Sequence, residues 1–178
     1  MFYDYEYMNN VRIKIWQNEI PIGQCETIKT IRRQYKINVQ KIDTDSMVIE
    51  LKIPSNNSNY GMLGVKYKCD TSGTNILIKV NKYEEELYED NMSIAPDIVH
   101  KGIPEDYVMG ILKSIDNNRN KLLRCGTYEF CIGAHGEVGS SEKIFYILTN
   151  IILILLCRQE IEKDAVEEII SSQIYHVL

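Results

Sequence analysis

The chain has 178 residues, of which 44% are hydrophobic and 25% charged, and its net charge is −5. This length and composition are typical of one soluble globular domain, residues 1–178, that buries a core without needing disulfides or metal. The negative net charge argues against nucleic-acid binding through the overall field, although a local basic patch could still bind.

The cysteines and the longest apolar run both indicate a cytoplasmic protein. Five cysteines occur, an odd number, and none forms a CxxC pair. The first ten residues are polar and lack the basic start of a signal peptide. The apolar run 144–157 is shorter than the ~20 residues that a membrane span needs. We therefore expect free thiols, a reducing compartment and no membrane partner.

The first half of the chain reads as strands separated by turns. Apolar residues alternate in four segments: 11–15, 47–54, 61–69 and 75–81. Residues 26–41 follow no single period, and the alternation there is best from Tyr35 onward. Residues 82–96 are rich in glutamate, which predicts either a solvated acidic helix or a long surface loop.

The second half reads as helix, strand and helix. Residues 103–119 predict an amphipathic helix with Pro104 in its first turn. A strand over 126–134 then leads through a glycine loop, HGEVG, into a helix over 144–156 that is apolar nearly all round and therefore buried. The expected core residues of the two helices are Tyr107, Ile111, Leu112, Ile115, Ile144, Leu148, Ile151, Ile152 and Leu155.

These elements predict an α+β domain with four or more strands, two main helices and a further C-terminal helix over 158–178. Residues 1–25 form an N-terminal extension whose strand, 11–15, we expect to join the sheet. No internal repeat or low-complexity linker divides the chain.

No motif in the sequence points to catalysis. The phosphate-binding patterns GxxxxGK[ST] and GxGxxG are absent, and the three histidines form no metal-binding pair. Cys131 and His135, four residues apart on a strand, would lie over ~13 Å apart and are no dyad. We therefore expect no enzyme activity, no nucleotide, no metal and no other cofactor.

Basic residues are dispersed, with the densest group at Arg32, Arg33, Lys36 and Lys41. Lys52, Lys66 and Lys68 lie on later strands. If these strands pair, a basic face forms despite the acidic total. The alternative is that the lysines only protect strand edges against aggregation.

Four segments in order resemble domain IV of elongation factor G and of the related tetracycline ribosomal protection proteins. They are ETIKTI (26–31), NYGMLGVKYKC (59–69), IPEDYVMGILKSI (103–115) and YEFCIGAHGEVGSSEKIF (128–145). The resemblance covers residues 26–157. It implies a two-layer α/β sandwich with a left-handed β-α-β crossover and two helices on one face of the sheet.

In these factors the tip loops of domain IV enter the decoding region of the small ribosomal subunit. Carried over to this chain, the tip positions are Ser58, Asn59, Tyr60 and Gly61 in one loop and His135, Gly136 and Glu137 in the other. We expect both loops at one end of the domain, with Tyr60 stacking on a base and His135 donating a hydrogen bond. Lys66 and Lys68 would attract phosphate.

The chain departs from the family pattern in ways that leave a second function open. The loop before Tyr60 lacks the family's arginines, Gly136 occupies the family's histidine position, and an acidic helix replaces the final strand. One hypothesis is a translation-factor-like module that binds the ribosome or RNA through its tip loops. The other is an acidic protein-binding module, a regulator or an immunity-type inhibitor, that keeps only the fold.

Overall fold

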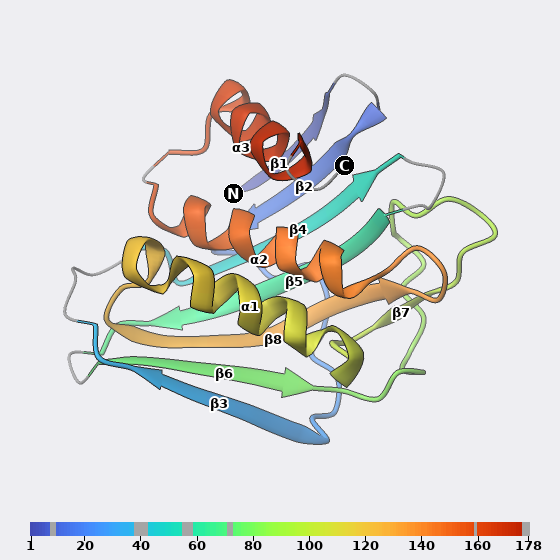
Figure 1. The fold of residues 1–178 in the computed structure, drawn as a ribbon. Coiled ribbons are helices and arrows are strands. Elements are labelled where there is room, and N and C mark those ends of the chain that lie inside the picture. Colours follow the sequence, from blue (N-terminus) through green and yellow to red (C-terminus); the bar gives the residue numbers. More distant parts are fainter. Residues whose placement is uncertain (8–9, 38–42, 55–58, 71–72, 159, 176–178) are drawn as a thin grey trace.

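The structure is a computed structural model that describes residues 1–7, 10–37, 43–54, 59–70, 73–158 and 160–175 (Figure 1). Its strands are β1 (Phe2–Glu6), β2 (Arg12–Gln17), β3 (Lys29–Tyr35), β4 (Ser46–Ile53), β5 (Asn59–Lys68), β6 (Thr74–Val80), β7 (Val99–Lys101) and β8 (Gly126–Gly136). Its helices are α1 (Glu105–Leu122), α2 (Glu142–Leu156) and α3 (Lys163–Tyr175).

The strands form one mixed sheet in the order β1-β2-β4-β5-β8-β6-β3, and β7 pairs with the end of β8. Every pairing is antiparallel except that of β6 with β8. Helix α1 makes the connection between these two parallel strands. In Figure 1 both strands point to the right, β8 lies above β6, and α1 lies in front of the sheet, so the crossover is left-handed.

Helices α1 and α2 cover one face of the sheet, here called the helix face (Figure 1). Phe145 of α2 stacks on Tyr107 of α1, with the ring centroids 4.6 Å apart. Leu148 of α2 is fully buried and lies over Gly61 of β5. The third helix, α3, packs beside α2 and accepts a hydrogen bond from Tyr7 at the carbonyl of Lys163. These contacts form the larger apolar core.

The opposite face of the sheet is covered only in part. A second apolar cluster joins strand residues such as Val48, Met62 and Ile132 to Ile22 and Met92 from the segments 18–25 and 81–98. Those segments therefore act as a lid over one half of this face. The other half carries side chains that are exposed or half-buried.

The structure confirms an α+β fold and all nine of the core residues expected in the two main helices. The free thiols are confirmed for all five cysteines.

Two strands, β1 and β7, were not predicted. Residues 82–96 form the long surface segment rather than the acidic helix, and α3 begins at Lys163 rather than at 158. The segment with the best alternation near Tyr35 runs into 38–42, which lie outside the described residues.

None of the helices in the described part of the chain is long and apolar enough to cross a membrane.

The approach of α1 to α2 leaves no room for a side chain at Gly110. A Cβ placed there would lie 2.1 Å from the carbonyl oxygen of Glu142. Alanine normally favours an exposed helix by about 1 kcal/mol relative to glycine. We predict that Gly110→Ala instead lowers the free energy of unfolding by more than about 1 kcal/mol, because the helices must separate. Urea denaturation measures this change.

Asn120→Ala, at an exposed position near the end of the same helix, serves as the control. Alanine has a higher helix propensity than asparagine, and this position has no close contact with α2. The free energy of unfolding should therefore stay unchanged or rise slightly. If Gly110→Ala behaved like this control, the packing of α1 against the start of α2 would be wrong.

Candidate functional site

The two segments expected to form a tip do lie together at one end of the sheet. Residue Met62 of β5 pairs with Ala134 of β8. The amide of Tyr60 donates to the carbonyl of Gly139 at 2.8 Å, and the hydroxyl of Ser140 donates to the carbonyl of Tyr60 at 2.7 Å. The expected juxtaposition is therefore confirmed for 59–61 and 135–137. Ser58 lies outside the described residues.

Tyr60 is a core residue and not a stacking platform. Its side chain is 1% exposed, and its hydroxyl donates to Oε1 of Glu50 at 3.0 Å. Glu50 is itself fully buried, accepts from the amide of Met92 at 2.9 Å and lies 3.5 Å from Nζ of Lys14. Burial raises the pKa of Glu50 despite these partners. The expectation that Tyr60 stacks on a base is wrong, because its ring lies on the covered part of the second face.

His135 is also buried, at the end of β8 rather than in an exposed loop. Its side chain is fully buried, and its ring lies 4.7 Å from that of Tyr83 and 5.7 Å from that of Tyr107. The ring of His100 is stacked with that of His135, with the centroids 5.9 Å apart. Burial lowers the pKa of His135 to about 4, against the opposing effect of the Gly102 and Tyr83 backbone. The expected role as an exposed donor is therefore wrong.

The glycine loop after β8 is hydrogen-bonded to the lid segment 81–98. The carboxylate of Asp97 accepts from the amides of Val138 at 2.9 Å and Gly139 at 3.2 Å. A Cβ at Gly136 would meet this carboxylate, so glycine is required where the loop passes Asp97. Nε2 of His100 lies 3.0 Å from Oε1 of Glu137. Gly136 is buried, and the exposed side chains of the tip are a carboxylate and an apolar group, which do not attract phosphate.

The uncovered half of the second face, called here the open face, carries two rows of side chains across four strands. Pairing places these residues side by side, and strand side chains alternate between faces, so each row points the same way. The rows are Arg32, Leu77, Glu129 and Lys66, and Gln34, Asn75, Thr127 and Lys68, with Lys79 next to Leu77 along β6.

The open face is locally positive although the chain is acidic. Arg32, Lys66, Lys68 and Lys79 supply four cations, and Glu129 supplies the negative charge of the two rows. Nζ of Lys79 lies 3.3 Å from Oε1 of Glu129, so this acid is already paired. Among the described residues, no ion pair involves the other three cations, Arg32, Lys66 and Lys68, although Lys66 lies directly opposite Glu129. Clustered cations on an uncovered surface are the usual electrostatic basis for binding phosphate.

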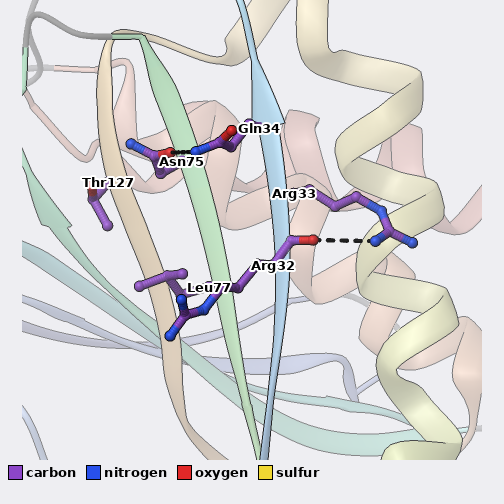
Figure 2. Close-up of a pocket in the computed structure, with 6 residues that line it drawn as sticks. All are labelled: Arg32, Arg33, Gln34, Asn75, Leu77 and Thr127. Atoms are coloured by element: carbon purple, nitrogen blue, oxygen red, sulfur yellow. Dashed lines mark hydrogen bonds between the residues drawn. The ribbon is translucent and has the colours of Figure 1, made fainter.

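The open face contains a hollow of about 580 Å³ beside the edge strand β3 (Figure 2). It is lined by Arg32, Arg33, Gln34, Asn75, Leu77 and Thr127. Figure 2 shows Arg32 next to Leu77 on this side of β3, whereas Arg33 extends toward α1 on the other. Nε2 of Gln34 donates to Oδ1 of Asn75 at 3.0 Å. The hollow thus combines a guanidinium, two amides, a hydroxyl and an apolar floor.

No group of three or more histidine, cysteine or acidic side chains in the described ranges is placed to hold a metal ion. Comparison with protein-family models gives no match, and comparisons with curated proteins and with solved structures give no significant match.

Of the residues predicted for the site, Lys66 and Lys68 lie on the open face. The others that the structure describes lie at the tip, where β5 begins and β8 ends: Asn59, Tyr60, Gly61, His135, Gly136 and Glu137. Sequence reasoning did not assign Lys79, Asn75 or Gln34 to a site. The sequence shows that they alternate with buried residues. It does not show the order of the strands, which brings these residues side by side.

The burial of a neutral histidine makes stability depend on pH. The pKa of His135 falls from 6.5 to about 4 on folding, so the unfolded chain binds a proton between these values that the folded protein does not. Stability therefore falls as pH drops from about 6.5 to about 4, by up to about 3 kcal/mol. We predict that His135→Phe removes most of this loss, measured by urea denaturation at pH 7 and pH 4.5.

His100→Gln is the matched control. The pKa of His100 is raised: burial lowers it, but hydrogen bonds to the Glu85 carbonyl and to Glu137 outweigh burial. Protonating His100 therefore favours the folded state, so its removal should keep most of the acid loss, less the part that the charge of His100 adds by lowering the pKa of His135. An acid loss in His135→Phe equal to that of wild type would rule out a buried neutral His135.

Proposed function

We propose that this protein is a non-catalytic RNA-binding module, similar to domain IV of elongation factor G, that binds RNA through the open face rather than through the tip. The observation that carries the proposal is the set of four cations on an uncovered half of the sheet in a chain of net charge −5. Opposite charge elsewhere on the molecule would orient the open face toward RNA during encounter.

The hand of the crossover supports the resemblance to domain IV of elongation factor G, from which the RNA-binding hypothesis came. Only about 2% of connections between parallel strands of one sheet are left-handed. The resemblance implied a left-handed crossover with two helices on one face, and the connection from β6 through α1 to β8 has that hand (Figure 1). A shared uncommon topology favours a common fold, although a fold alone does not supply a function.

The open face suits an extended single strand. Neighbouring strands lie about 4.8 Å apart, so a row from Arg32 to Lys66 spans roughly 14 Å. This length fits a few nucleotides crossing the strands, with phosphates at the cations. Sheet surfaces of this kind serve as RNA platforms in other modules. We infer that the ribosome is the setting if the domain IV resemblance holds.

A salt series tests the proposal. Binding of a fluorescent 12-nucleotide single-stranded RNA is measured by anisotropy from 25 to 200 mM salt. Each lost phosphate contact reduces the magnitude of the slope of log affinity against log salt by about 0.7 for a single strand. We predict that Lys66→Gln/Lys68→Gln makes the slope less negative by about 1.4.

The control is Arg119→Gln/Lys121→Gln, which removes the same charge from exposed positions of α1 on the opposite side of the sheet. It should leave the slope unchanged. Equal effects of both double variants would mean that net charge, not the open face, sets affinity. Failure of wild type to bind RNA or ribosomal subunits at 25 mM salt would refute the proposal.

The second candidate, a protein-binding module, is favoured by apolar side chains exposed at the tip and lid. Val138 is 80% exposed, and Leu87, Ile94 and Ile98 are about half-exposed. These lie in or beside the acidic segment 82–96, as an interface with a basic protein would need. Under this reading Val138→Ser would abolish partner binding, whereas the lysine variants of β5 would not.

A further inference from the structure

The hollow on the open face presents chemically different groups along its two rows. In one row the guanidinium of Arg32 is followed by the apolar side chain of Leu77. In the other, Gln34 is followed by Asn75 and then by Thr127. An apolar surface therefore lies next to a line of hydrogen-bonding groups, with a cation at the β3 end. Phosphate binding alone would need only the cation.

The amide pair retains unused hydrogen-bonding capacity. Nε2 of Gln34 donates to Oδ1 of Asn75, which leaves Oε1 of Gln34 as an acceptor and Nδ2 of Asn75 as a donor. Figure 2 shows the free nitrogen of Asn75 on the side of Thr127 and the free oxygen of Gln34 on the opposite side. The hydrogen bond between the two amides favours this arrangement of their free groups. Side-chain amides are groups with which proteins read base edges.

We propose that this hollow takes one unpaired nucleotide, with the base against Leu77, its edge against Asn75 and Gln34, and a flanking phosphate at Arg32. The inference rests on the RNA-binding function proposed above and adds a preference for base identity to it. Lys68, which follows Thr127 in the same row, lies where a neighbouring phosphate would pass.

The geometry favours a single strand over a duplex. The amides lie on the sheet surface in the row next to Leu77, so a base packed against Leu77 must lie with its edge along the sheet to reach them. In a duplex the Watson–Crick edges are already paired, and the major groove of A-form RNA is too narrow for side chains to read. An unpaired base offers its edge and its apolar face together.

The test uses four 8-nucleotide RNA homopolymers and one RNA duplex of equal length, each bound to the full chain and followed by anisotropy. Wild type should bind the single strands more tightly than the duplex. Its affinities for the strongest and the weakest homopolymer should differ by about fivefold or more, as one well-placed amide contact provides. Asn75→Ala should reduce this difference in affinity to less than twofold without changing the salt slope. Arg32→Gln should make the salt slope less negative by about 0.7 and keep the difference in affinity between homopolymers.

Thr30→Ala, on the same face of β3 but outside the hollow, is the control and should change neither quantity. Equal binding of all four homopolymers by wild type would overturn the nucleotide site and leave the RNA-binding function intact. Tighter binding of the duplex, or a difference in affinity unaffected by Asn75→Ala, would do the same. Absence of binding to every RNA would overturn both proposals.

Discussion

The parallel pairing of β6 with β8 is the constraint on which the arrangement of both sheet faces depends. Two parallel neighbours cannot be joined by a hairpin, so the chain must cross the sheet between them. Helix α1 makes that crossing on the helix face, and α2 fills the remaining space beside it. The rest of the connection, residues 81–98, first covers one half of the second face. That segment packs on the half of the face next to β4 and β5, and the half over β3 and β6 stays uncovered.

Charge is distributed in keeping with this division. Acidic residues are concentrated in the lid segment 82–96 and in the first part of α3, whereas the open face gathers cations from β3, β5 and β6. Solvation alone explains why an uncovered face carries polar side chains, but amides and hydroxyls would serve for that as well as charged side chains do. An excess of positive charge in a chain of net charge −5 is the less expected arrangement. This contrast is why the open face, rather than the tip, carries the functional proposal.

The sequence predicted best where the signal is local. Helix α1 was found because apolar residues repeat at helical spacing along it, and α2 because its residues are apolar nearly all round, which also identified their core. Strand β7 has three residues, too few to show a period. His135 was expected in a loop because glycines follow it. It is buried because β7 extends the pairing of β8 to Gly136 and because Tyr83 and Tyr107 close over its ring. Those residues are distant in sequence, so no local pattern reveals the contact.

The number of cations limits what phosphate contacts alone can do. With Lys79 paired to Glu129, about three cations remain, which gives a salt slope near −2 for a single strand. Such binding weakens about 20-fold between 50 and 200 mM salt. Nucleic-acid binders that rely on charge use six to ten phosphate contacts, so this face would need a further source of affinity. Contacts to the base in the hollow would supply it, and they depend little on salt. The acidic remainder of the surface would then discourage other orientations, so that a small basic face could be specific without being strongly attractive.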